Sequence, residues 1–235
     1  MMNEIDRLEQ ISEDFGYSAG VMAASIEYCY AVFSRHLNGR NILELGPAEG
    51  LMTELLLRKG IPLTVVEGSH KFCESISSRF PQVNVVHSLF EEYRPAEKYD
   101  NIILGHVLEH VVDPVALLVR VKAWLKEGGK VFAAVPNAQS IHRQAAVIMG
   151  LLACEDELNE SDLHHGHRRV FGLDAFRECF VGAGLTIDVS GGYWLKPLSN
   201  GQIEGHWTPS MIAAFMELGE RYPEIAGEIY VIASD

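Results

Sequence analysis

The sequence has no long uninterrupted apolar run and few basic residues. No stretch approaches the roughly 18 uncharged apolar residues that span a bilayer, and the N-terminus MMNEIDRLEQ is acidic and polar, unlike a signal peptide. Lysine and arginine number 19 against 32 acidic residues, which gives a net charge of -13. Such a charge repels nucleic acid and anionic lipid. We therefore expect a cytoplasmic protein without nucleic-acid or membrane partners.

Cysteine is also scarce. The four cysteines are scattered and form no CxxC pair, and no histidine lies at metal-ligand spacing from any of them. Free thiols in a reducing compartment fit this pattern best. A chain of 235 residues with 48% hydrophobic content is long enough for one large α/β domain, whereas a second domain would be cramped.

Apolar segments alternate with helical patterns along the chain. Strands are expected at 41–45, 63–67, 83–87, 99–105, 130–136, 185–195 and 228–234. Helices are expected at 18–37, 51–59, 114–126, 139–153, 173–183 and 209–221, and a further helix is expected between the strand at 63–67 and about residue 80. The pair Gly128-Gly129 is expected to form a turn. This rhythm predicts a parallel sheet with both faces covered by helices.

The segment NILELGPAEG, residues 41–50, joins the first expected strand to a helix through a glycine loop. Gly46 and Gly50 allow positive φ, and Ala48 between them is small, so a ligand can lie against the main chain at the helix N-terminus. A dinucleotide fingerprint GxGxxG fails at Ala48 and Leu51. The loop also holds no Lys or Arg, which favours a cofactor without phosphates. The alternative is an ordinary strand-to-helix turn.

The second expected strand ends in Glu67, seventeen residues beyond Gly50. In a doubly wound sheet the ligand lies across the carboxyl ends of the strands. A carboxylate at this position can accept hydrogen bonds from both hydroxyls of a ribose. The alternative is a solvated acid at a strand end.

The segments ILELGPAEG and YDNIILGHVLEHVVDP, together with Glu67, resemble the class I S-adenosylmethionine-dependent methyltransferases, especially the branch that includes ubiquinone-biosynthesis O-methyltransferases. The resemblance covers roughly residues 40–137, and HGHRRVFGLDAFRECFVGAGL is similar too. It implies S-adenosylmethionine as cofactor and a doubly wound, mostly parallel, Rossmann-like seven-stranded α/β sheet with a final antiparallel strand. We expect one domain, 1–235, with a helical cover (1–38), a cofactor core (39–137), a substrate-side insertion after strand five (138–171) and a C-terminal sheet completion (172–235).

The resemblance also implies which residues bind the cofactor. They are Glu44, Gly46, Ala48 and Gly50 along its amino-acid and ribose parts, Glu67 at the ribose hydroxyls, Ser88 and Leu89 beside the adenine, Gly105 and His106 at the methionine portion, and Tyr17 closing over it. Two positions depart from the family pattern, since Ala48 stands where glycine is frequent and Ser88 where an acid commonly contacts the adenine.

Methyl transfer from a sulfonium is a direct displacement, so the enzyme mainly aligns the acceptor and excludes water. A base is needed only when the acceptor must lose a proton, and histidine suits that role. His106 is the first candidate by position, with a wall of the cofactor pocket as the alternative. His110 and His167 are further candidates, although His110 could equally bond within the protein. Asp113 with Pro114 predicts a helix cap.

The insertion carries the basic segment LHHGHRRVF in an acidic protein. We expect His164, His165, Arg168 and Arg169, with Arg143, to face the substrate, where the arginines would bind a carboxylate or phosphate of the acceptor. The alternative is a solvated surface or pairing with CEDELNESD. We expect no metal, because this segment lacks an obvious carboxylate or thiolate pattern. Weaker candidates for the pocket rim are Tyr193, Trp194, Lys196, His206 and Trp207.

The sequence thus predicts an enzyme that moves a methyl group to an oxygen or nitrogen of a small anionic metabolite, in natural-product or sugar biosynthesis, as a monomer or homodimer. One alternative is a non-catalytic methyltransferase-like binding subunit. The other is an NAD-dependent oxidoreductase on a similar sheet, which the missing GxGxxG disfavours.

Overall fold

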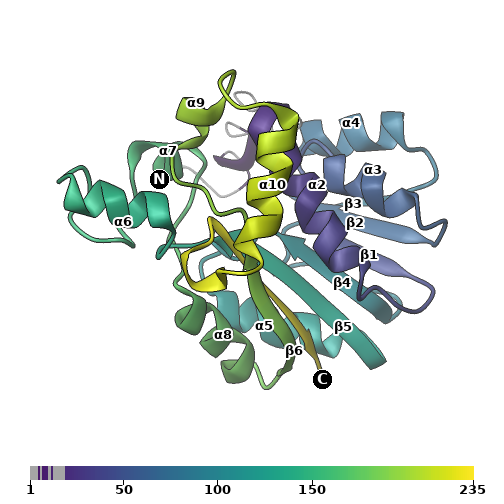
Figure 1. Ribbon diagram of the computed structural model, residues 1–235. Coiled ribbons are helices and arrows are strands. Elements are labelled where there is room, and N and C mark those ends of the chain that lie inside the picture. Colours follow the sequence, from purple (N-terminus) through teal and green to yellow (C-terminus); the bar gives the residue numbers. More distant parts are fainter. Residues whose placement is uncertain (1–4, 6, 10–11, 13–18) are drawn as a thin grey trace.

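A computed structural model describes residues 5, 7–9, 12 and 19–235. Tyr17, expected to close over the cofactor, lies outside the described residues. A twisted sheet runs through the molecule (Figure 1). Its strands are β1 (Ile42–Leu45), β2 (Leu63–Glu67), β3 (Asn84–His87), β4 (Tyr99–Gly105), β5 (Leu125–Pro136), β6 (Thr186–Tyr193) and β7 (Glu228–Ser234).

The seven strands are ordered β3-β2-β1-β4-β5-β7-β6. The first five pair in parallel, so their carboxyl ends meet at one edge of the sheet. Strand β7 runs antiparallel to both β5 and β6. The predicted doubly wound, mostly parallel seven-stranded sheet with a final antiparallel strand is therefore confirmed.

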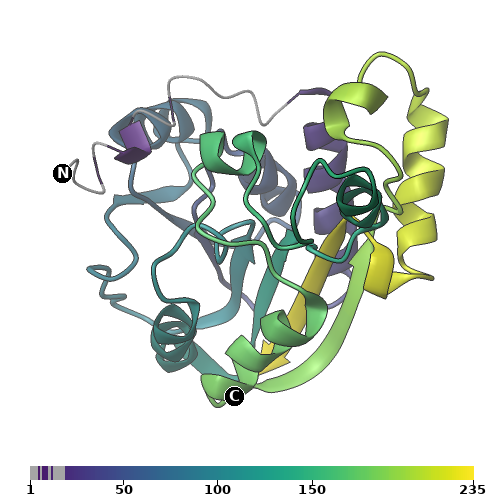
Figure 2. The same ribbon diagram turned by 90° about the vertical axis from the view of Figure 1, so that its left-hand side faces the viewer.

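Helices cover both faces of the sheet (Figures 1 and 2). They are α2 (Gly20–Ser34), α3 (Leu51–Leu57), α4 (His70–Arg79), α5 (Pro114–Ala123), α6 (Ile141–Ile148), α7 (Glu160–His164), α8 (Leu173–Gly182), α9 (Asn200–Ile203) and α10 (Pro209–Gly219), with a 3-10 turn at Pro223–Ile225. The insertion after β5 carries α6 and α7, and α6 projects from the body of the molecule in Figure 1.

Two apolar cores lie on opposite faces of the sheet. Strand β4 supplies both, because its side chains alternate: Ile102 and Leu104 belong to the core beneath α5 and α8, and Ile103 belongs to the core beneath α2, α3, α4 and α10. All three side chains are fully buried. A parallel strand covered on both faces reads as a continuous apolar run, which is why YDNIILG was recognisable from the sequence.

The expected turn at Gly128-Gly129 is wrong as a strand boundary. Both glycines lie inside β5, which begins at Leu125, five residues before the expected start. The reason is a register shift against β4, which lets the chain bend without leaving the sheet. Gly128 adopts φ 73°, and a Cβ on Gly129 would lie 2.9 Å from the carbonyl oxygen of Tyr99. Glycine is therefore needed here for close approach within the ladder.

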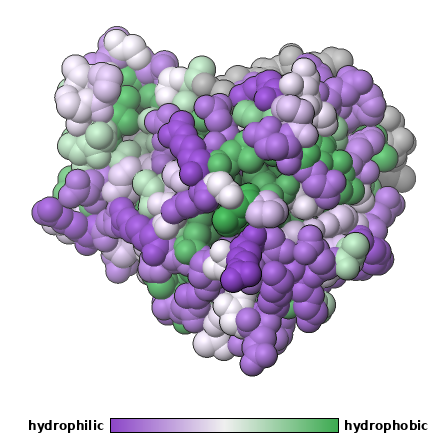
Figure 3. Space-filling model, turned by 90° about the vertical axis from the view of Figure 1, so that its right-hand side faces the viewer, coloured by the Kyte–Doolittle hydropathy of each residue, from purple (hydrophilic) through white to green (hydrophobic). Residues whose placement is uncertain are grey.

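The expected helix cap is present at the start of α5. The Asp113 carboxylate accepts a hydrogen bond of 2.9 Å from the backbone N–H of Ala116, and Pro114 occupies the first turn. None of the helices in the described part of the chain is long and apolar enough to cross a membrane. The face with α3, α4 and the β3 edge is mostly hydrophilic around a central apolar area (Figure 3).

Candidate active site

A cavity of about 930 Å³ lies at the carboxyl ends of the parallel strands. Its walls include the residues that follow β1, β2, β3, β4 and β5 in turn, together with parts of α2, α3 and the insertion. This volume is in the upper part of the range of about 300–1,000 Å³ found for small-molecule sites. The cavity therefore has room for a cofactor and an acceptor side by side.

The glycine loop forms one wall and turns sharply between β1 and α3. Gly46, Ala48 and Gly50 all have positive φ, at 63°, 48° and 79°. Gly46 and Ala48 line the cavity, whereas Gly50 caps the N-terminus of α3 with its α-carbon facing Ile76. Gly50 thus acts through its backbone conformation rather than by contact with the cavity.

Glu44, at the end of β1, is buried and lines the same wall. Its carboxylate accepts a hydrogen bond of 2.7 Å from the Thr53 hydroxyl of α3. Burial raises the pKa of Glu44 to about 8. The side chain is therefore mostly protonated near neutral pH and is positioned to ionise when a cation reaches it.

Glu67 holds the loop from the neighbouring strand. One carboxylate oxygen accepts a hydrogen bond of 3.2 Å from the backbone N–H of Ala48, and the other accepts one of 2.9 Å from that of Ser69. Burial raises the pKa of Glu67, although these backbone hydrogen bonds oppose the shift. Each oxygen keeps a second lone pair, so the carboxylate can also accept from two hydroxyls of a ligand.

The expected adenine neighbours, Ser88 and Leu89, also line the cavity after β3. The Ser88 hydroxyl donates to the carbonyl of Leu89 at 2.9 Å. Two N-terminal residues that sequence reasoning missed lie nearby. Leu8 packs against Gly68 and lines the cavity, and the Glu9 carboxylate accepts from the Ser69 hydroxyl at 2.9 Å.

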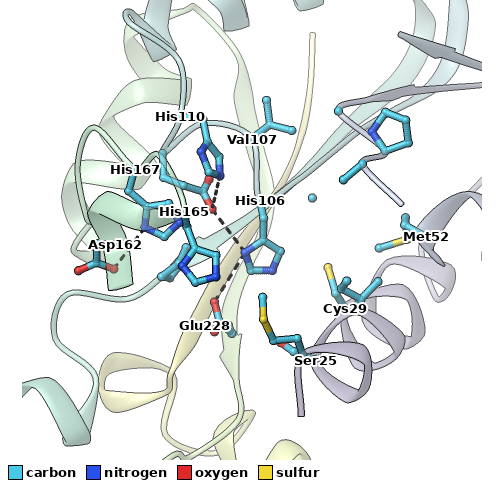
Figure 4. A pocket seen from close by; sticks show the side chains of 18 of the residues that line it. Ser25, Cys29, Met52, His106, Val107, His110, Asp162, His165, His167 and Glu228 are labelled. Atoms are coloured by element: carbon cyan, nitrogen blue, oxygen red, sulfur yellow. Dashed lines mark ion pairs between the residues drawn. The ribbon is translucent and has the colours of Figure 1, made fainter. Parts of the chain in front are cut away.

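His106 follows β4 and lines the cavity beside Gly105. Its φ of 58° is unusual for a residue other than glycine, and its backbone N–H donates to the carbonyl of Ala134 at 2.8 Å. Figure 4 shows the imidazole between Glu228 and the loop that carries His110. Its Nε2 lies 3.4 Å from the hydroxyl of Tyr193.

Two buried carboxylates face the other nitrogen of His106. Nδ1 lies 3.5 Å from Glu109 Oε1 and 3.9 Å from Glu228 Oε2. Burial alone would lower the pKa of His106, but the two carboxylates outweigh it and raise this pKa above its ordinary value. Burial raises the pKa of Glu228, while the adjacent histidines hold that of Glu109 low against burial. His106 is therefore equipped to accept a proton inside the cavity.

The three arginines expected to bind the acceptor are engaged with the protein. Arg143, only 5% exposed, donates to the Asp162 carboxylate at 3.0 Å and to carbonyls at 155 and 157. Arg168 donates to the carbonyl of His110 at 2.8 Å. Arg169 donates to the carbonyls of residues 108, 111 and 112. The guanidinium groups thus brace the insertion and the loop after β4; Arg143 lines the cavity as expected, whereas Arg168 and Arg169 lie outside its lining.

The histidines of the insertion separate into two groups. His165 and His167 line the cavity, whereas His164 is exposed and outside its lining. Burial lowers the pKa of His110 to about 4, so this imidazole is neutral. Glu109, His110 and His167 each offer a possible metal-ligand atom, and these atoms lie within 4.8 Å of one another. The carboxylate missing from the histidine-rich segment is thus supplied by a different loop.

Of the five residues expected at the rim of the pocket, some line the cavity and others do not. Trp194 and Lys196 line the cavity, and the Lys196 ammonium donates to Asn200 at 3.0 Å and lies 5.3 Å from the centre of the Trp194 ring. Tyr193 is buried behind the wall, where its hydroxyl lies 3.4 Å from His106 Nε2. His206 and Trp207 lie outside the cavity lining, and Trp207 stacks on Phe215 of α10 instead.

A sheet of this order, with a glycine loop after β1 and a buried acid ending β2, defines a class I S-adenosylmethionine-dependent methyltransferase. The chain belongs to the methyltransferase domain family, whose model matches residues 14–189. This confirms the resemblance seen in the sequence.

Known relatives agree with this assignment. The chain is 25% identical over 144 residues to a ubiquinone biosynthesis O-methyltransferase of Coxiella burnetii, a match that covers 57% of this chain and 62% of the relative. Less than two thirds of that relative's length is therefore matched. Among solved structures, a possible histamine N-methyltransferase from Thermotoga maritima is similar with a TM-score of 0.67 at 14% identity, covering 97% of this chain and 99% of the other. The N-methyltransferase NodS from Bradyrhizobium japonicum has a TM-score of 0.63 at 13% identity, covering 99% and 98%.

Proposed function

We propose that the protein transfers the methyl group of S-adenosylmethionine to an oxygen or nitrogen atom of a small acceptor. The observation that carries the proposal is the cavity itself, whose lining combines the glycine loop and Glu67 with His106. The cavity is open, which disfavours the alternative of a non-catalytic binding subunit.

The cofactor would lie along the carboxyl ends of β1 and β2. Glu67 would accept from the two ribose hydroxyls, and Glu44 would meet the ammonium group of the methionine part. Ser88 and Leu89 would flank the adenine, as the family resemblance implies. Methyl transfer then needs an acceptor lone pair held in line behind the sulfonium methyl group, with water excluded.

His106 would take the proton of the acceptor. Its Nε2 is near Tyr193, and its Nδ1 faces the two carboxylates, which stabilise the imidazolium. Because Glu109 and Glu228 make this wall acidic, the acceptor group that meets His106 would be a neutral hydroxyl or amine rather than a carboxylate. The expectation of an anionic metabolite relied on arginines that hydrogen-bond within the protein, and of these three only Arg143, like Lys196, lines the cavity.

A screen of candidate acceptors with S-adenosylmethionine labelled in its methyl group tests this function. We expect label transfer to at least one hydroxyl or amine compound by the wild-type protein, and a loss of about 100-fold or more in turnover in His106→Ala, with cofactor affinity nearly unchanged. Undiminished turnover in His106→Ala would remove the base from the mechanism. Transfer only to carboxylate acceptors would contradict the proposed polarity of the site.

A further inference from the structure

Three hydrogen-bond donors in the cavity lining are not used by methyl transfer as described. Trp194 and Lys196 come from the segment after β6, and His142 comes from α6 in the insertion. Trp194 has a φ of 62°, and its carbonyl accepts a hydrogen bond of 2.6 Å from the backbone N–H of Gly227. Lys196 lies along Gly227, where an added Cβ would be 3.4 Å from the Cβ of Lys196. The backbone therefore fixes the place of this lysine on the cavity wall.

Lys196 is buried with most of its hydrogen-bonding capacity unused. The residue is 8% exposed, and its ammonium donates to Asn200 Oδ1 at 3.0 Å. Among the residues that the structure describes, no carboxylate forms an ion pair with this ammonium. An ammonium has three N–H donors, so two remain for a ligand. Burial lowers the pKa of Lys196 against the attraction of Glu228, and a bound anion would stabilise the charged form.

The other two donors are buried without partners. Trp194 Nε1 and His142 Nδ1 form no hydrogen bond within the described part of the chain. An indole N–H can only donate. Burial, together with the positive charges of Lys196 and Arg143, lowers the pKa of His142 to about 3, so its imidazole is neutral and carries one N–H. Buried polar groups normally have partners, so unsatisfied donors that line one cavity indicate a ligand that accepts hydrogen bonds.

We propose that Trp194, Lys196 and His142 bind a carboxylate group of the methyl acceptor. An ionised carboxylate only accepts hydrogen bonds, and its two oxygens have enough lone pairs for all three donors. Its charge would strengthen the hydrogen bonds from Lys196 in particular. The group that receives the methyl is a different one, a hydroxyl or amine at His106, so the acceptors are small hydroxy acids or amino acids. The inference rests on the proposed function only in assigning this carboxylate to the acceptor.

The charges around these donors also favour an anion. Arg143 and Lys196 are the lysine and arginine side chains in the cavity lining of the described chain, and Arg143 is paired with Asp162 at 3.0 Å. Glu228, the acid whose charge acts on Lys196, lies 3.9 Å from Nδ1 of His106. Each of these two carboxylates therefore has a basic neighbour of its own. Lys196 is left as the cation that a ligand can neutralise.

The test measures the binding of small carboxylates and needs no turnover. Fluoroacetate and para-fluorobenzoate, each paired with its primary amide, are titrated into the full chain with and without saturating S-adenosylhomocysteine, and fluorine NMR gives the affinities. Lys196→Met removes the charge and keeps an apolar stem, and Trp194→Phe removes the indole N–H and keeps an aromatic ring. Lys98→Met is the control, because Lys98 is exposed and directly precedes β4 at the amino end of that strand. Titration with S-adenosylhomocysteine alone reports on the cofactor site of each sample.

We expect at least one of the carboxylates to bind the wild-type chain about 10-fold or more tightly than its amide, in the presence of S-adenosylhomocysteine. Lys196→Met should abolish this preference, Trp194→Phe should weaken carboxylate binding by about 10-fold, and Lys98→Met should change neither. If Lys196→Met does not fold, Trp194→Phe and the preference of the wild-type chain still decide the matter.

Three results would overturn the proposal. The first is that neither carboxylate binds the wild-type chain more tightly than its amide, and the second is that the preference persists in Lys196→Met. The third is carboxylate binding that saturating S-adenosylhomocysteine abolishes, because the donors would then belong to the cofactor site. Failure to bind S-adenosylhomocysteine would instead contradict the proposed function, and the preference for carboxylates would then be measured on the chain alone.

Discussion

Replacing Glu67 by glutamine is the change that most sharply separates a cofactor-binding acid from a structural one. The carboxylate accepts from the backbone N–H groups of Ala48 and Ser69, one at each oxygen. An amide has a single acceptor oxygen, so its NH₂ group must face one of these two donors. The substitution removes the charge while keeping the volume, so the buried wall of the cavity keeps its shape.

The magnitude follows from the hydrogen bonds that change. A hydrogen bond to a charged group contributes about 1.5–3 kcal/mol, and every 1.4 kcal/mol is tenfold in affinity. Loss of one such bond to a ribose hydroxyl should weaken cofactor binding by about 10-fold to 100-fold. The unpaired backbone N–H should also lower the free energy of unfolding by about 1–3 kcal/mol. Glu67→Ala, which leaves both donors unpaired, should lower both quantities further.

Calorimetric titration with S-adenosylhomocysteine and thermal unfolding measure the two effects on the same samples. Glu127→Gln removes an equal charge from an exposed position in β5 and should change neither. If Glu67→Gln binds S-adenosylhomocysteine as tightly as the wild-type chain, Glu67 does not contact the cofactor. If affinity and stability fall together in Glu127→Gln, the effect is one of net charge and the reasoning fails.

Four further predictions concern other parts of the molecule. Arg169→Ala should lower the free energy of unfolding by about 2 kcal/mol, because three backbone carbonyls lose a charged donor; an unchanged melting temperature would show that water replaces it without cost. Gly219→Ala should destabilise by about 2 kcal/mol or more, because its Cβ would lie 2.3 Å from the backbone nitrogen of Trp194, whereas Gly201→Ala meets no atom within 4 Å and should cost far less. Cofactor binding near pH 7 should release a proton from Glu44, whose pKa of about 8 in the free protein must fall when an ammonium group binds; binding enthalpies that do not vary with the ionisation enthalpy of the buffer would contradict this. Because the folded pKa of Glu44 exceeds the unfolded value of 4.5, its contribution to stability should decline between about pH 4.5 and 8, and Glu44→Gln should flatten that decline.

The sheet, and the cavity wall that contains the glycine loop and Glu67, could be predicted because their signals are local. Strand β2 was expected at 63–67 and is found there; the glycine loop directly follows β1 in the sequence, and Glu67 is the last residue of β2. Parallel strands place such neighbouring loops at one edge, so a pattern read along the chain also gives proximity in space. The prediction of a turn between elements at Gly128-Gly129 was wrong because glycine also occurs at bulges inside a strand.

The acceptor wall could not be predicted because its contacts join distant segments. Glu109 was missed, although it adjoins His110, because its burial depends on the insertion that packs against its loop. Glu228 was read only as the first residue of an apolar strand. Arg168 and Arg169 were recognised as a basic cluster in an acidic protein and were expected to face the substrate. The sequence cannot reveal that backbone carbonyls of the loop between β4 and α5 accept hydrogen bonds from them.

The most direct test of the account is a calorimetric titration of the full chain with S-adenosylhomocysteine and, separately, with NAD. The account predicts one molecule of S-adenosylhomocysteine bound per chain and no heat of binding with NAD, because the loop after β1 lacks the GxGxxG spacing and any basic residue that would hold a pyrophosphate. Binding of NAD without binding of S-adenosylhomocysteine would contradict the assignment of the cavity.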